Sequence, residues 1–230
     1  TTEQLAFPLQ KLWVWRSNQP PRTAWSGPAK WDAYSGNSGL QSMRNFDPCF
    51  YATADRQTVF LGSSADDAVH AIDAATGKES WVFVTGAPVR LPPTIDGDRV
   101  LFGSDDGFAY GCDKSSGKEL WRVRAGVSDQ RIVNDRKIIS LWPIRTGVLV
   151  DRGLATFAGS LVPWEPSFVV TVDAGSGSAE GPGCFRRELT DVTLQGALLA
   201  SDEQFYVPQG RAAPLAFRRA DGEPRGSVGE

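Results

Sequence analysis

The sequence predicts an all-β chain, a β-propeller built from four-stranded antiparallel blades, and two observations support this prediction. First, residues 71–81 and residues 111–121 share the pattern small-x-Asp-x-x-Ser/Thr-Gly-Lys-Glu-x-Trp and begin 40 positions apart. Second, the residues before them also match, with residues 59–63 aligned on residues 100–104 and an Asp-rich turn after each. A repeat of this length, built from short strands and turns, is typical of a propeller blade.

Each of these two copies predicts the same order of elements: a strand, an Asp-rich hairpin, a strand, a hairpin at the Thr/Ser-Gly-Lys step and an outer strand. The glycines suit these hairpins because glycine readily adopts positive φ. The outer strands begin at Trp81 and Trp121, and a further strand precedes each hairpin pair, at residues 91–95 in the second copy. Each blade therefore has four strands.

Two weaker copies follow the well-formed ones. Residues 155–177 keep a strand, the Asp and the Gly, whereas residues 205–222 keep less, and Gly226 stands where the Trp is expected. Before the first full copy, residues 12–16 are expected to form the last strand of an earlier blade. The predicted organisation is an irregular aromatic- and proline-rich segment (1–43), two well-formed repeats (44–125), an inserted loop (126–142) and two degenerate repeats (143–230).

About four blades with irregular ends favour an incomplete set, part of a larger propeller, because propellers use roughly 4 to 8 blades and ring closure protects their edges. A complete four-bladed domain is the alternative. The aromatic-rich start of the chain is expected to pack over the propeller or to form a partner surface.

Composition excludes some classes of function. The formal net charge of −3 argues against non-specific nucleic-acid binding, which needs a basic face. No apolar run approaches the roughly 18 residues of a membrane-spanning helix. Cys49, Cys112 and Cys184 have no zinc or haem spacing, and a disulfide between blades remains open. Cys112 aligns with Ile72 and is expected to be a small core residue.

The repeated frame resembles the pyrroloquinoline-quinone (PQQ) repeat of quinoprotein-like bacterial propellers. The resemblance is strong over residues 55–125, moderate over 145–230 and weak before 44. It implies that the Trp packs between neighbouring blades, that the polar residues of the motif tie blades together, and that the protein is periplasmic or exported. The blade-docking residues it implies are Asp73, Gly77, Trp81, Asp113, Gly117 and Trp121, and both Trp side chains are expected to be largely buried.

The same repeat occurs in non-enzymatic propellers, such as the BamB-type outer-membrane assembly lipoproteins, and in quinoprotein alcohol dehydrogenases. The dehydrogenases hold PQQ over calcium and usually have a vicinal disulfide, metal ligands and a catalytic Asp, but this chain lacks adjacent cysteines. Fold alone does not decide between these functions.

No catalytic or metal-binding residue is predicted. Asp66-Asp67 and Asp105-Asp106 occur at the same point of successive blades, which favours hairpin-turn chemistry over calcium ligation. His70 lies within a strand and is expected to be structural or on the surface.

A second recurrence suggests a binding site. Arg90, Arg145 and Gln195 each precede the following turn by six positions, and Arg44 lies in the corresponding approach of the blade before, out of register. We expect these side chains at the mouth of the central channel, where arginine would suit a carboxylate or phosphate. The alternative is that each Arg pairs with an acidic residue of a neighbouring blade.

The function we predict is a non-catalytic binding or scaffold module of a bacterial protein, with no cofactor. Its ligand would be an anionic molecule or an acidic partner segment at the channel mouth, and the inserted loop, which runs into Arg145, would cap the same face. The alternative is a piece of a PQQ-dependent alcohol dehydrogenase.

Overall fold

The computed structural model describes residues 8–20, 52–134, 136–209 and 212–228, and its regular elements are all β-strands. The strands form four four-stranded antiparallel sheets and one two-stranded sheet, which confirms the predicted fold class. In each four-stranded sheet the strands neighbour one another in chain order, as in a propeller blade. No helix in the described part of the chain is long and apolar enough to cross a membrane.

The first two blades coincide with the two well-formed repeats. The strands of blade 1 are β1 (Ala52–Ala54), β2 (Thr58–Ser63), β3 (Ala68–Asp73) and β4 (Glu79–Val84). The strands of blade 2 are β5 (Thr94–Asp96), β6 (Arg99–Gly103), β7 (Phe108–Asp113) and β8 (Glu119–Arg124).

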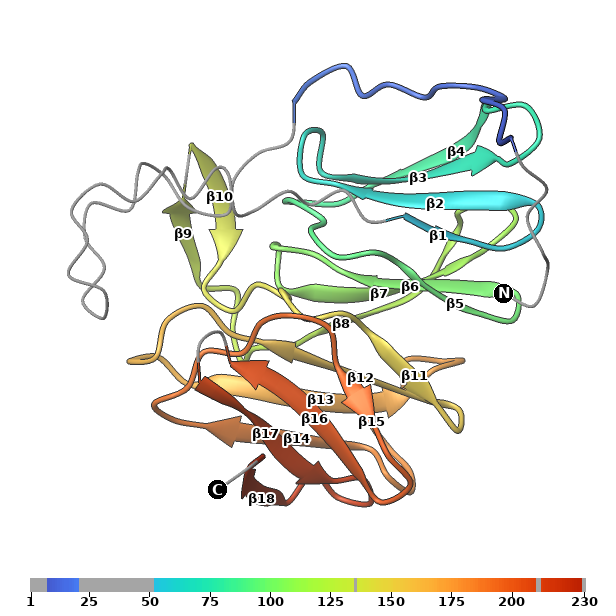
Figure 1. Cartoon of the computed structure of the whole chain (residues 1–230). Coiled ribbons are helices and arrows are strands. Elements are labelled where there is room, and N and C mark those ends of the chain that lie inside the picture. The colour runs from blue at the N-terminus through green and yellow to red at the C-terminus, as the bar shows by residue number, and fades with distance from the viewer. Residues whose placement is uncertain (1–7, 21–51, 135, 210–211, 229–230) are drawn as a thin grey trace.

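The two degenerate repeats also form complete blades. The strands of blade 3 are β11 (Leu149–Asp151), β12 (Leu154–Gly159), β13 (Ser167–Asp173) and β14 (Phe185–Leu189). The strands of blade 4 are β15 (Leu199–Ala200), β16 (Gln204–Gln209), β17 (Ala212–Arg218) and β18 (Pro224–Ser227). Figure 1 shows the four blades following one another from blue-green to red along the chain.

The hydrophobic core lies between blades because alternate residues of a strand face opposite sides of its sheet. Phe60 of blade 1 packs with Val100 and Phe102 of blade 2. The next two junctions are built in the same way. Leu101 and Ala109 of blade 2 pack with Phe157 and Phe168 of blade 3. Ala158 and Val169 of blade 3 pack with Phe205, Val207 and Phe217 of blade 4.

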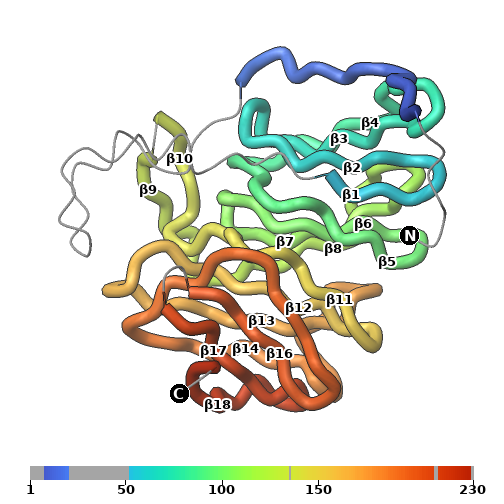
Figure 2. Tube along the Cα trace, in the orientation of Figure 1, coloured from blue at the N-terminus to red at the C-terminus, as the bar shows by residue number. Residues whose placement is uncertain are grey.

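The inserted segment contains a hairpin, β9 (Arg131–Asn134) and β10 (Lys137–Ser140), where the sequence predicted a loop. The β-branched pairs on either side of the turn favour strands, and Arg136 takes the positive φ of 66° that a tight turn requires. Figures 1 and 2 both show this hairpin standing to one side of the four blades.

The N-terminal segment differs from the prediction as well. Residues 12–16 form no strand, so the expected last strand of an earlier blade is absent as a hydrogen-bonded element. The segment is held by a side chain instead: Trp13 donates its Nε1–H to the carbonyl oxygen of Ala74 at 2.9 Å.

Candidate functional site

Three tryptophans make the same contact with the blade that follows them. Trp13, Trp81 and Trp121 donate their Nε1–H to the carbonyl oxygens of Ala74, Lys114 and Ala174, at 2.9, 3.0 and 3.1 Å. Trp121 is buried, and Trp81 is half-buried and packs against the core that joins blades 1 and 2.

Each indole ring lies over the motif glycine of the next blade. A Cβ on Gly117 would lie 2.6 Å from the ring of Trp81, and a Cβ on Gly177 would lie 2.8 Å from the ring of Trp121. Both glycines have positive φ, 71° and 69°. Only glycine both leaves room for the ring and readily adopts positive φ. Gly77 lies beneath Trp13 in the same way.

The motif aspartates bind their own turns, which corrects the expectation that they tie blades together. Asp73 and Asp113 accept hydrogen bonds from the hydroxyl and the backbone N–H of Thr76 and Ser116. The hydrogen bond from the Ser116 side chain is the main reason that the pKa of Asp113 falls to about 2. The Trp–Gly contact, rather than the carboxylate, therefore crosses the junction.

The strand register places Arg90 and Arg145 at equivalent positions, as predicted, and both bind one carboxylate. Arg90 Nε lies 2.7 Å from Asp105 Oδ2, and Arg145 contacts both Asp105 oxygens at 3.0 and 2.9 Å. All three side chains are buried. Burial alone would raise the pKa of Asp105, but the charges and hydrogen bonds of Arg145 and Arg90 outweigh it and hold that pKa below its usual value.

This geometry supports the structural alternative for the two arginines, since the carboxylate they bind comes from the chain itself. Gln195 is half-buried and belongs to the connection between β14 and β15, where its backbone N–H donates to the carbonyl oxygen of Pro208. Arg44 lies outside the described residues. A binding role for this set stays a prediction.

The acidic turns are occupied by groups of the chain. Asp66 accepts from His70 Nε2 at 3.0 Å, and Asp67 binds Lys137. Asp106 accepts from the Tyr110 hydroxyl at 2.7 Å. Within the described ranges, no group of three or more His, Cys, Asp or Glu side chains is arranged to hold a metal ion. Each of these turn carboxylates is therefore paired with a side chain of the same chain.

His70 is a buried structural residue. Its Nδ1 lies 2.6 Å from Glu79 Oε2, its Nε2 contacts Asp66, and the Trp15 ring lies 5.0 Å away. These two contacts link the second hairpin of blade 1 to its first.

Two of the three thiols lie in the described part of the chain. Cys112 is buried and free, and burial raises its pKa to about 12. Cys184 is half-buried and free, and burial raises its pKa as well. Cys49 lies outside the described residues.

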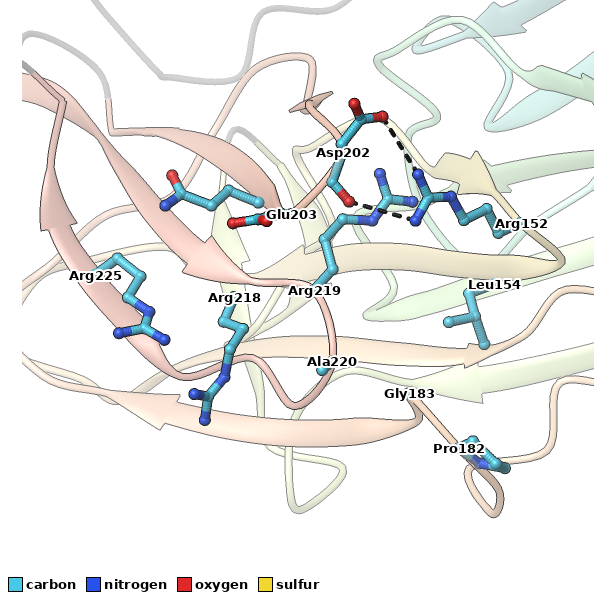
Figure 3. A pocket seen from close by; sticks show the side chains of 11 residues that line it. Arg152, Leu154, Pro182, Gly183, Asp202, Glu203, Arg218, Arg219, Ala220 and Arg225 are labelled. Atoms are coloured by element: carbon cyan, nitrogen blue, oxygen red, sulfur yellow. Dashed lines mark hydrogen bonds and ion pairs between the residues drawn. The ribbon is translucent and has the colours of Figure 1, made fainter.

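Sequence reasoning missed a cleft of about 1020 Å³ between blades 3 and 4, which Figure 3 shows from close by. Arg152, Arg218, Arg219 and Arg225 line it. The repeat contained one sign of this cleft. Arg218 pairs with Gln204 of blade 4, just as Asp113 pairs with Arg99 of blade 2. An arginine therefore stands in blade 4 where the motif has an aspartate.

Comparison with curated proteins finds short matches. The chain is 32% identical over 89 residues to 1-butanol dehydrogenase (quinone) of Thauera butanivorans, covering 35% of this chain and 13% of that protein. It is 26% identical over 61 residues to tetrathionate hydrolase of Acidithiobacillus ferrooxidans, covering 26% of this chain and 12% of that protein. The chain thus spans a small part of the length of both relatives.

Solved structures share the fold. The quinohemoprotein alcohol dehydrogenase ADHIIG of Pseudomonas putida HK5 superimposes with a TM-score of 0.60 at 14% identity, covering 75% of this chain and 32% of that one. The corresponding enzyme of Comamonas testosteroni gives 0.58 at 14% identity, covering 86% and 42%.

The match to a family is broader than the matches to the two curated proteins. The family model of the outer membrane protein assembly factor BamB, a PQQ-repeat propeller, matches residues 14–179. That range contains the Trp81–Gly117 and Trp121–Gly177 junctions and blades 1 and 2 entirely. The chain therefore belongs to the BamB family of PQQ-repeat propellers.

Proposed function

We propose that the chain is a non-catalytic binding module of an exported bacterial protein and that it contacts a protein partner through the β9–β10 hairpin. The observation that carries the proposal is an exposed aliphatic pair on an element inserted between two regular blades. Inserted segments on a rigid scaffold are frequent sites of recognition.

The register of the hairpin divides its side chains between two faces. Ile139 pairs with Ile132 and is buried, so this pair faces the propeller. Ile138 pairs with Val133 on the opposite face, and these side chains are 60% and 77% exposed. Neighbouring exposed aliphatic residues of this kind are typical of protein-interaction surfaces.

The hairpin is fixed beside its turn and at its base. Lys137 of β10 binds Asp67 in the first hairpin of blade 1. Trp142, directly after the hairpin, lies over Gly126 and donates its Nε1–H to the carbonyl oxygen of Pro166 at 2.7 Å. A rigid base lowers the entropy that ordering would cost when a partner binds.

The charges near the exposed pair specify the partner further. Arg131 and Arg136 are both exposed on the same hairpin. A partner segment with an apolar centre and an acidic border would complement this surface. This surface differs from the channel mouth at Arg90 and Arg145, where the sequence predicted an acidic partner segment.

Photocrosslinking in living cells of the organism whose genome encodes the protein tests this proposal. We expect a crosslinker at Val133 to give one discrete protein adduct whose yield falls sharply when Ile138 is changed to Asp. The matched control is a crosslinker at Leu199, which is similarly exposed on β15. Equal adducts from both positions, or an adduct insensitive to Ile138→Asp, would contradict the proposal.

A second candidate is a part of a quinone-dependent oxidoreductase, favoured by the 32% identity to 1-butanol dehydrogenase (quinone). The cofactor implied is PQQ with calcium, which supplies the redox chemistry only where the protein positions it. Titration of the chain with PQQ and calcium separates the two functions. Our proposal expects no saturable binding, and tight stoichiometric binding would favour the oxidoreductase.

A further inference from the structure

The cleft between blades 3 and 4 has walls from four different turns and strands (Figure 3). Its volume of about 1020 Å³ is at the upper end of the range that small-molecule sites occupy. Apolar groups of Leu154, Pro182 and Ala220 contribute to its lining, and Asp202 and Glu203 also face it.

The cationic residues of the cleft lie where blade 4 departs from the repeat. Arg218 replaces the aspartate that binds the turn in blades 1 to 3, and Arg225 lies in the outer strand, at the position of Leu120 in blade 2. Gly226 replaces the docking Trp. In the fourth repeat, arginines that line the cleft thus stand at the positions of the turn-binding aspartate and of Leu120.

Two of the four arginines are firmly engaged by the chain itself. Arg219 binds Asp151, and Arg218 binds Asp221 through Nε at 2.8 Å and also contacts Glu223. The hydrogen bond from Arg218 is the main reason that the pKa of Asp221 falls to about 2. These pairs form the fixed frame of the cleft.

The other two arginines make only long contacts. Arg152 Nη1 lies 3.3 Å from the carbonyl oxygen of Asp202 and its Nη2 lies 3.4 Å from Asp202 Oδ1, and Arg225 Nη2 lies 3.8 Å from Glu223 Oε2. Good guanidinium–carboxylate bonds are about 2.7–2.9 Å. The two side chains are 62% and 44% exposed. Figure 3 shows them on opposite sides of the view, with Arg152 on the side of Leu154 and Arg225 beyond Arg218.

We propose that this cleft binds a small organic dianion, with one acidic group on Arg152, the other on Arg225 and an apolar body between them. The guanidinium fork matches a carboxylate or a phosphate in two hydrogen bonds. Asp202 is fully exposed and turns into water at little cost when an anion replaces it at Arg152. Asp202 and Glu203 disfavour ligands of higher negative charge.

This proposal goes beyond the partner-binding hairpin and shares no residue with it. Isothermal titration with α,ω-dicarboxylates from glutarate to suberate tests it, because the series varies the distance between the acidic groups. We expect saturable one-to-one binding by at least one chain length, tighter than that of butyrate or inorganic phosphate. The affinity should fall as salt rises, because exposed charges are screened.

The variants Arg152→Gln and Arg225→Gln should each weaken binding by about tenfold or more, the usual effect of losing a charged hydrogen bond. Arg122→Gln removes the same charge from an exposed position of β8 that does not line the cleft, and it should leave binding unchanged. Unaltered denaturation midpoints would show that the variants fold. The proposal is overturned if no dicarboxylate binds at millimolar concentrations, if butyrate or phosphate binds equally well, or if Arg122→Gln has the same effect.

Discussion

The junction between blades 2 and 3 and the junction between blades 3 and 4 solve the same packing problem with different residues. At the first, Trp121 covers Gly177 and donates a hydrogen bond to the carbonyl oxygen of Ala174. At the second, Phe185 covers Gly222, and a phenyl ring has no N–H to donate. The position equivalent to Ala174 is Arg219, whose carbonyl oxygen therefore receives no indole hydrogen bond.

The difference shows which part of the motif the fold requires. The aromatic ring over a glycine of positive φ is present at both junctions. The indole hydrogen bond and the turn-binding aspartate are present only at the first, and the cleft lined by arginines opens at the second. Ring–glycine packing holds the blades together, and the polar positions are free to acquire another role.

Truncating Trp121 should have the largest effect on this comparison. We expect Trp121→Ala to lower the free energy of unfolding by about 3–5 kcal/mol, the usual range for a buried aromatic residue. Trp81→Ala should cost less because Trp81 is half-buried. Urea denaturation measures both. Trp164→Ala is the control, since Trp164 is exposed, and equal losses for Trp164 and Trp121 would contradict the account.

Neutralising Asp105 tests the ion cluster beside the same junction. We expect Asp105→Asn to cost about 3 kcal/mol, because it removes the buried countercharge of Arg90 and Arg145. A loss below 1 kcal/mol, as for an ordinary surface substitution, would show that the cluster is not structural.

The pH dependence of stability should change in the same variant. The pKa of Asp105 is lowered in the folded state, so its contribution is complete above the unfolded pKa of about 4 and disappears as pH falls through the folded-state value. The free energy of unfolding of Asp105→Asn should therefore fall less steeply on the acid side than that of the parent. If the free energies of unfolding of the variant and of the parent fall equally steeply as the pH is lowered, this assignment is contradicted.

Phe185→Trp places an indole ring over Gly222, as Trp121 lies over Gly177 at the first junction. We expect a gain of about 0.5–1.5 kcal/mol from a new hydrogen bond to the Arg219 carbonyl oxygen, the net value of one such bond. Denaturation midpoints measure it, with Phe217→Trp as the control for added ring volume without that acceptor. A loss of stability in Phe185→Trp would show that the fourth blade is offset from the repeat geometry.

Arg225→Gln should have the smallest effect on stability, within about 0.5 kcal/mol, because Arg225 is exposed and its contact with Glu223 is long. The same denaturation series measures it. A larger loss would assign Arg225 to the frame of the cleft rather than to its ligand.

The repeat allowed the blades and the equivalence of Arg90 with Arg145 to be predicted from the sequence, because both depend on spacing within the motif. The packing of Trp81 and Trp121 between blades was expected from the resemblance to the PQQ repeat, and the structure adds the glycine beneath each ring. Asp105 was missed as the partner of these arginines because it was interpreted as part of a turn. Its partners lie 15 and 40 positions away, and only the stacking of blades brings them together.

Two other features were missed for local reasons. Phe185 follows its motif aspartate at a greater distance than Trp121 follows Asp113, so the longer loop moved it out of the expected position. The strand–turn–strand pattern of residues 131–140 was present, with aliphatic pairs on both sides of the turn, but it lay outside the repeat period. The cleft depends on side chains from several turns of blades 3 and 4, and no short segment encodes it.

Hydrogen exchange of the native protein, followed by mass spectrometry, tests the central claim that junctions built on the full motif are stronger than the junction to blade 4. Amides that exchange only by global unfolding report the most stable unit, and faster ones report local opening. We predict that amides of β6, β7 and β13 exchange at the global limit, whereas amides of β16 and β17 exchange faster through a separate opening of blade 4. Uniform protection of all four blades, or slowest exchange in blade 4, would contradict the account.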